Sequence, residues 1–260
     1  MNVAQTSMDS DLPPNARVPL RLPTGEVHIW RARLDLDPFE LARISRSLSA
    51  DEHARASRFH FDRDRNHFVA ARAILRDILS RYLGCDPLEI KLTSGSHDKP
   101  ELAGPARRRP RFNLSHSAGV AIYAVALDRE VGIDIERVRV DVDYFDLAEK
   151  FFAAGEIRRL HHLAPDQRVS GFFNCWTRKE AYIKARGLGL SIALDSFEVS
   201  LAPAEPAAVL FETRDILTGA IGGTLPRLSL IDLGDGLGFA AALAVEGDVP
   251  VLRALNWENP

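Results

Sequence analysis

F-F-N-C-W-T-R-K-E-A-Y-I-K-A-R, residues 172–186, has the apolar spacing of a buried helix. Trp176, Glu180 and Lys184 follow one another at four-residue intervals, so they lie on one face of that helix. A Glu and a Lys at this spacing can form an ordinary surface ion pair, which stabilises a helix by about 0.2–0.5 kcal/mol. The alternative is a functional pair, and an acidic strand upstream favours it.

That strand is V-G-I-D-I-E, residues 131–136. Side chains alternate between the two faces of a strand, so Asp134 and Glu136 share a face and lie about 7 Å apart. At an effective dielectric of about 20, two such charges repel by about 2 kcal/mol, and a cation between them removes this cost. Mg²⁺ prefers oxygen ligands and keeps positions for substrate phosphates. We therefore predict Asp134, Glu136 and Glu180 as metal ligands; the alternative is the solvent-exposed face of a half-buried strand.

Two further candidates lie in N-L-S-H-S, residues 113–117. Ser115 and His116 suggest a hydrolase dyad, but adjacent strand residues point to opposite faces and cannot form one. Donation to a phosphate is the better interpretation, and His116 could alternatively bond the backbone at the strand end. Lys184, one turn from Glu180, could also counter phosphate charge.

The composition limits the class of protein. With 260 residues, 46% apolar and 27% charged, the chain is typical of a soluble globular protein. Its net charge of −3 gives no support to nucleic-acid binding. The longest apolar runs, 119–127 and 238–245, are too short to span a bilayer. The two cysteines, Cys85 and Cys175, show no metal-binding spacing, and we expect reduced thiols in a cytoplasmic protein.

An internal repeat organises the chain. D-P-L-E-I-K-L (86–92) follows the first long helix and D-S-F-E-V-S-L (195–201) follows the second, while residues 119–128 are echoed by residues 236–246. This order predicts two related α+β halves. We expect a disordered tail at 1–16, an N-terminal half at 17–130, a C-terminal half at 131–247 and a C-terminal tail at 248–260. Expected helices begin near Pro38, Ser49, Arg63, Val142, Ala154 and Pro165, and Ser49 with Glu52 is a predicted capping box at the start of the second. Expected strands cover 27–36, 88–92, 112–116, 120–127, 131–136, 197–201, 209–213, 227–233 and 237–245.

These motifs resemble a known family. The strand V-G-I-D-I-E and the later W-T-R-K-E-A-Y-I-K-A-R-G-L-G-L are similar to the two signatures of the Sfp-type 4′-phosphopantetheinyl transferases. The loop K-P-E-L (99–102) and F-N-L-S-H-S (112–117) resemble that family's coenzyme A-binding segments. The resemblance implies a pseudo-twofold fold of two α+β halves with coenzyme A and Mg²⁺ in the cleft between them. It also implies that a chain of this length acts as a monomer.

The resemblance also implies roles for individual residues. Asp134, Glu136 and Glu180 match the metal ligands, and Asp134 also belongs to the coenzyme A site. Glu180 and Lys184 are the expected catalytic residues. The remaining expected coenzyme A contacts are Lys184 at the phosphates, Ser115 and His116 at the nucleotide phosphate, Lys99 and Pro100 at the adenine, and Arg55. The sequence departs from many relatives in S-G-S-H-D before Lys99, where they have a shorter turn.

The implied reaction transfers the 4′-phosphopantetheine arm of coenzyme A to a serine hydroxyl of an apo acyl or peptidyl carrier protein. Its products are the holo carrier protein and adenosine 3′,5′-bisphosphate. Glu180, directly or through a water, would help to deprotonate the serine. Two alternatives remain: a magnesium-dependent nucleotide phosphodiesterase that uses the same acids, and a non-catalytic coenzyme A-binding module.

Overall fold

A computed structural model describes residues 19–94, 99–104, 110–187, 191–213, 225–234 and 238–258. The chain divides into two compact units. A helical unit comprises residues up to 21 and residues 38–90, and a larger unit comprises residues 22–37 and residues from 91 onward. In the described part of the chain, none of the helices combines the length and apolar character needed to cross a membrane.

The helical unit contains α1 (Pro38–Ser45), α2 (Ala50–Ala56), α3 (Asp62–Leu83) and the 3₁₀ turn η1 (Pro87–Glu89). The predicted capping box at the start of α2 is confirmed: the Ser49 hydroxyl accepts from the Glu52 amide, and the Glu52 carboxylate accepts from the Ser49 amide. Gly84 ends α3 in the left-handed conformation, with φ of 67°, which glycine adopts at little cost. Leu48, Ala56, Val69 and Ala73 form a small apolar core between these helices.

The larger unit contains two sheets. The first has the strand order β11-β1-β5-β4 and is built from β11 (Val251–Asn256), β1 (Glu26–Arg33), β5 (Val120–Leu127) and β4 (Pro110–Ser117). The second has the order β6-β10-β9 and is built from β6 (Val131–Arg137), β10 (Phe239–Glu246) and β9 (Leu228–Asp232). Two short hairpins, β2 (Leu92–Ser94) with β3 (Pro100–Leu102) and β7 (Phe197–Val199) with β8 (Val209–Glu212), account for the other strands of the described residues.

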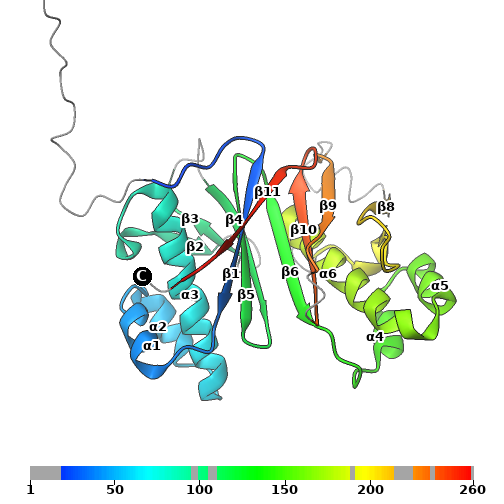
Figure 1. The fold of residues 1–260 in the computed structure, drawn as a ribbon, viewed down its shortest axis with the longest axis horizontal. Coiled ribbons are helices and arrows are strands. Elements are labelled where there is room, and N and C mark those ends of the chain that lie inside the picture. Colours follow the sequence, from blue (N-terminus) through cyan, green and yellow to red (C-terminus); the bar gives the residue numbers. More distant parts are fainter. Residues whose placement is uncertain are drawn as a thin grey trace, which may run out of the picture. The chain divides into compact units, whose positions relative to one another are not determined.

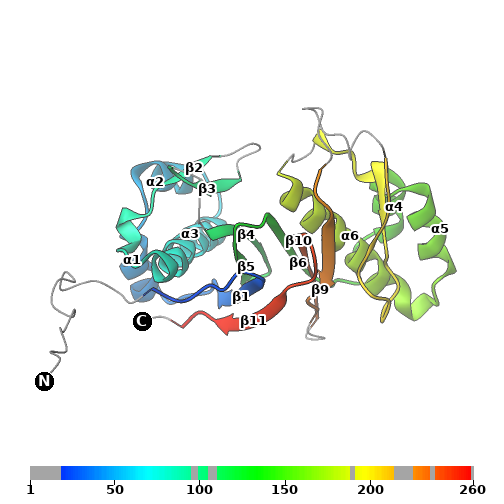
Figure 2. The same cartoon turned by 90° about the horizontal axis from the view of Figure 1, so that it is seen from above.

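Two apolar cores cover the opposite faces of the second sheet. On one face, Val131, Ile133 and Ile135 of β6 pack with Ile122, Ala124 and Ala126 of β5. On the other face, α6 (Arg168–Arg186) lies against β6 and β10, and α4 (Tyr144–Phe151) and α5 (Ala154–His162) lie on the same side (Figures 1 and 2). Alanines at 240, 242 and 244 of β10 let α6 approach this sheet closely. The apolar spacing that predicted a buried helix at residues 172–186 is thus confirmed.

The order of elements repeats. The first half has the order β1, α1, α2, α3, η1, β2, β3, β4, β5. The second half has the matching order β6, α4, α5, α6, η5 (Leu194–Ser196), β7, β8, β9, β10. The second half also has a turn, η3 (Pro165–Gln167), before α6. The pairing repeats too: β5 lies between β1 and β4, and β10 lies between β6 and β9. Both sequence repeats therefore fall on matching elements, as expected for two related α+β halves.

Two expectations need correction. Residues 88–92, expected as a strand, instead contain η1 and only the first residue of β2, because the Asp86 side chain and Pro87 favour a capped turn. The expected C-terminal tail contains β11, which pairs in parallel with β1 from Glu26↔Val251 to Arg31↔Asn256. The two compact units are a different division of the chain from the two repeated halves, because both sheets share the core between β5 and β6.

Candidate active site

Strand β6 and helix α6 bring the two predicted motifs together at Gly132. A side-chain carbon at this position would lie 2.1 Å from the Ala181 carbonyl oxygen and 2.3 Å from the Ala185 amide nitrogen. The space at Gly132 is therefore filled by the last turns of α6. Since Asp134 and Glu136 share this face of β6, they are presented toward the helix that carries Glu180 and Lys184.

Asp134 is at the centre of the site. It is buried, and its Oδ1 accepts hydrogen bonds from Lys184 Nζ at 2.6 Å and from Ser115 Oγ at 2.7 Å. Lys184 Nζ also contacts Ser115 Oγ at 3.2 Å and the Ile133 carbonyl at 3.3 Å. The other oxygen, Asp134 Oδ2, is buried without a hydrogen-bond partner among the described residues. A buried carboxylate oxygen normally has a partner, so this one has an unused capacity to bind a donor or a cation.

Glu136 and Glu180 surround Asp134 with further negative charge. Burial is the main cause that raises the pKa of Glu136. The hydrogen bond that Ser117 Oγ donates to Glu136 lowers this pKa, and repulsion from Asp134 raises it further. Burial also raises the pKa of Glu180, followed by repulsion from Asp134. Lys184 opposes both shifts. Three acids thus interact with one another, and Lys184, joined at Glu136 by Arg139, offsets part of their repulsion.

From Asn113 onward, every second side chain of strand β4 forms a hydrogen bond to strand β6. Asn113 Oδ1 accepts from the Ile133 amide at 2.9 Å, Ser115 Oγ donates to Asp134, and Ser117 Oγ donates to Glu136 Oε2 at 2.8 Å. These β4 residues lie on one face because they are two positions apart. His116 is exposed, and the strand alternation directs it to the opposite face from Ser115. The structure therefore supports the argument that Ser115 and His116 form no dyad, and it brings Ser115 to the acids.

Lys99 lies at the other end of the α6–β6 junction. Its Nζ donates to the Lys184 carbonyl at 2.9 Å and to the Val131 carbonyl at 3.4 Å, and it lies 3.6 Å from Glu130 Oε2. Burial lowers the pKa of Lys99, mainly by desolvation. Pro100 begins β3 and lines a small pocket with Arg111 and Glu130. Their expected adenine contacts stay predictions, and residues 95–98 of the preceding loop lie outside the described residues.

Arg55 lies in the helical unit. Its guanidinium is 5.7 Å from the centroid of the Phe68 ring, which α3 carries. Its expected contact with coenzyme A stays a prediction.

The acids are suited to a metal ion but are not gathered around one point. Within the described ranges, no three His, Cys, Asp or Glu side chains are close enough together to hold a metal. The orphaned Asp134 oxygen and the unbalanced charge of Glu136 and Glu180 nevertheless fit a hard cation that takes oxygen ligands.

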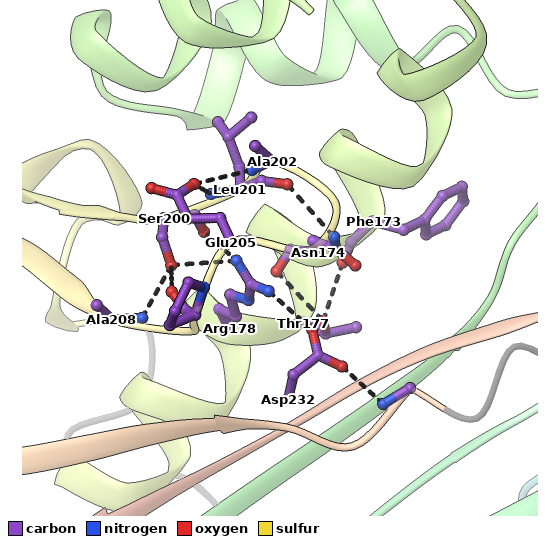
Figure 3. Close-up of polar contacts among 12 residues, drawn as sticks. Phe173, Asn174, Thr177, Arg178, Ser200, Leu201, Ala202, Glu205, Ala208 and Asp232 are labelled. Carbon is purple, nitrogen blue, oxygen red and sulfur yellow. Dashed lines mark hydrogen bonds and ion pairs between the residues drawn. The ribbon is translucent and has the colours of Figure 1, made fainter.

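The sequence interpretation missed Arg178, which fixes the far side of α6. This side chain is almost fully buried, and it donates to Asp232 Oδ2 at 2.7 Å and to the Ser200 carbonyl at 2.8 Å. Figure 3 shows Arg178 between Asp232 of β9 and the segment that begins at Ser200. The available signal was its place in the helix motif, two residues before Glu180. Residues two apart on a helix point in different directions, so Arg178 had to contact elements other than β6.

The sequence interpretation also missed Lys179, which lies one residue before Glu180 and points to another face of α6. It forms a fully buried ion pair with Glu156 of α5, with Nζ to Oε2 at 2.8 Å. Its ammonium also donates to the Leu194 and Phe197 carbonyls, each at 2.6 Å, and lies 4.1 Å from the centroid of the Phe197 ring. Arg178 and Lys179 thus anchor α6 to its surroundings, while Glu180 and Lys184 face β6.

Comparisons with known proteins agree with this arrangement. A family model described as "4'-phosphopantetheinyl transferase superfamily" matches residues 130–221, and one described as "4'-phosphopantetheinyl transferase, N-terminal" matches residues 36–127. The chain is 40% identical over 236 residues to the 4'-phosphopantetheinyl transferase HetI of Nostoc sp., covering 90% of this chain and 92% of that protein. It is 30% identical over 162 residues to the 4'-phosphopantetheinyl transferase Sfp of Bacillus subtilis, covering 62% and 70% respectively. With two matched halves, a near full-length relative and the signature acids facing the signature lysine, this chain belongs to the 4'-phosphopantetheinyl transferase superfamily.

Proposed function

We propose that this enzyme transfers the 4′-phosphopantetheine arm of coenzyme A to a serine hydroxyl of an apo acyl or peptidyl carrier protein. The observation that carries the proposal is the pairing of Lys184 with Asp134 beside an unpartnered carboxylate oxygen and two further acids. This site combines a cation for phosphate with carboxylates for a metal and for proton transfer. Family membership supplies the reaction class.

Asp134, Glu136 and Glu180 would hold Mg²⁺ in this proposal. The unpartnered Asp134 Oδ2 supports the assignment, and the flexible glutamates would have to turn toward it. When bound, Mg²⁺ supplies positive charge that stabilises the pyrophosphate of coenzyme A during bond cleavage.

The protein side chains have separate tasks in the reaction. The ammonium of Lys184 binds the phosphate on the leaving side, and Ser115 Oγ orients Asp134 through its 2.7 Å hydrogen bond. Glu180 accepts the proton of the carrier serine at its carboxylate, and the raised pKa of Glu180 makes it a better proton acceptor. The serine oxygen then forms a bond to the β-phosphorus, the bond to the bridging oxygen breaks, and adenosine 3′,5′-bisphosphate leaves.

We also propose that the enzyme acts as a monomer in the cytoplasm. The repeated order of elements supports the first part, because one chain contains both halves of the fold. The free thiols of Cys85 and Cys175 support the second, because a reducing compartment preserves them.

The test is intact-protein mass spectrometry of an apo carrier protein incubated with the enzyme and coenzyme A, with Mg²⁺ or with excess chelator. We expect a Mg²⁺-dependent gain of one phosphopantetheine arm, and a large loss of rate in Glu180→Gln. Cleavage of coenzyme A without any gain on acyl or peptidyl carriers would instead indicate a phosphodiesterase. Binding of coenzyme A without either change would indicate a non-catalytic module.

A further inference from the structure

Lys99 contacts the backbone of both signature motifs, the end of helix α6 and the start of strand β6. Its side chain is 13% exposed, and its ammonium reaches the carbonyl of Lys184 in the last turn of α6 and the carbonyl of Val131 at the start of β6. Both carbonyls flank the point where the two elements approach most closely, at Gly132. The buried ammonium of Lys99 therefore bridges the helix and the strand at one end of their contact, in addition to the Lys184–Asp134 pair.

The bond to Lys184 satisfies a helix terminus. The last four carbonyls of an α-helix have no partner within the helix, and α6 ends at Arg186. The Gly187 amide bonds the Ile183 carbonyl, and the Lys99 ammonium bonds the next one, that of Lys184. A positive charge at this end also interacts favourably with the helix dipole. Lys99 thus caps α6 from a distant part of the chain.

The residue that Lys99 caps is the residue whose side chain binds Asp134. Lys184 contacts Lys99 through its carbonyl and Asp134 through its ammonium. The surrounding charges keep Lys99 in place: Glu130 lies 3.6 Å from Nζ, and Arg111 lies 3.3 Å from the same carboxylate. A change at Lys99 would therefore move the backbone that carries Lys184 and, one turn earlier, Glu180.

We infer that Lys99 is a positioning residue, whose ammonium sets the register of Glu180 and Lys184 against Asp134 by tying the C-terminus of α6 to β6. The inference rests on the proposed function, and it differs from an adenine contact by Lys99. A positioning role affects the chemical step, because displacements of about 1 Å can cost about 100-fold in rate. An adenine contact would chiefly affect the binding of coenzyme A.

The test compares wild type, Lys99→Met, Lys99→Arg and the matched surface variant Lys91→Met. Lys91 is exposed and precedes β2, so the control removes a lysine from the same region of the chain. The first readout is amide hydrogen exchange of residues 181–187, measured by mass spectrometry without coenzyme A or metal. The second is the kcat and KM for coenzyme A in carrier modification, and the third is the Mg²⁺ concentration for half-maximal rate.

We expect Lys99→Met to lose exchange protection in the last turn of α6, to lower kcat about 10- to 100-fold and to require more Mg²⁺. Lys99→Arg should recover most of the rate, because it keeps the charge and several donors. Lys91→Met should match wild type. If Lys99→Met does not fold, Lys99→Gln replaces it, since its amide can still donate to one carbonyl but lacks the charge.

Three results would overturn the inference. They are a rise in KM for coenzyme A with unchanged kcat, unchanged exchange in α6, and faster exchange with unchanged kcat. Absence of transfer by wild type would instead refute the proposed function, and the exchange measurement would still report on the helix cap.

Discussion

Lys184 and Asp134 form a 2.6 Å ion pair that joins the end of α6 to the middle of β6. The pair uses Asp134 Oδ1, while Oδ2 remains buried without a partner among the described residues. One carboxylate can therefore bind the lysine on one oxygen and a cation on the other. This division of its two oxygens underlies the proposed magnesium site.

The first prediction concerns metal binding by Asp134. In wild type, added Mg²⁺ should raise the melting temperature, because a ligand that binds only the folded state stabilises it. Asp134→Asn should abolish most of this rise, since the neutral amide supplies no anionic oxygen to the metal. Differential scanning fluorimetry across a Mg²⁺ series measures the effect. The exposed Asp166→Asn is the control, and an equal Mg²⁺ response in Asp134→Asn would exclude this carboxylate as a ligand.

The second prediction concerns the close approach at Gly132. In Gly132→Ala, the new methyl group would meet backbone atoms of α6 at 2.1 and 2.3 Å, so the helix and strand must separate. We expect a loss of about 1–3 kcal/mol in the free energy of unfolding, together with a loss of transfer activity. Urea denaturation and the carrier assay measure the two effects. In Gly25→Ala, φ is 89° and the new carbon would meet no atom of the described residues within 4 Å apart from its chain neighbours, so only backbone strain arises and activity should persist. Wild-type stability and activity in Gly132→Ala would contradict the packing argument.

The third prediction concerns the buried ion pair between Lys179 and Glu156. Both side chains are fully buried, so Lys179→Met would leave a carboxylate without its charge partner. Breaking such a pair on one side typically costs about 3–5 kcal/mol. Urea denaturation should show this loss, whereas Arg111→Met, which breaks a half-exposed pair with Glu130, should cost at most about 1 kcal/mol. Similar losses in the two variants would show that burial does not decide the effect.

The fourth prediction concerns pH and His28. This histidine is completely buried on β1, and burial lowers its pKa from the usual value near 6.5, although the hydrogen bond that His28 Nε2 donates to Glu26 Oε2 raises it. Below about pH 6.5 the unfolded chain therefore binds a proton that the folded chain does not, and stability falls as the pH falls. The slope from this one group is at most about 1.4 kcal/mol per pH unit.

Denaturation curves between pH 8 and pH 5 test this expectation. The variant His28→Gln should lose part of the decline that wild type shows, while the exposed His162→Gln should keep it. An identical pH dependence in wild type and His28→Gln would show that this histidine does not contribute.

The sequence determined the local structure because local rules act over a few residues. The spacing of apolar residues indicated α6, the alternation in V-G-I-D-I-E indicated β6, and the capping box at Ser49 marked the start of α2, all as observed. The same alternation correctly separated Ser115 from His116, and the repeated segments indicated two halves with matching elements. The spacing within a strand and a helix also placed the acids and Lys184 on the faces where the structure brings them close together, while their roles stay predictions.

The tertiary structure decided the contacts between residues far apart in the chain. The parallel pairing of β11 with β1 joins the two ends of the described chain, and no local pattern indicated it. The partners of Arg178 and Lys179 lie on β9 and α5, so their anchoring roles depend on how those elements pack. The Lys99 cap on α6 links residues 85 positions apart. Such contacts form only when packing brings the elements together, so the sequence names the groups and the fold selects their partners.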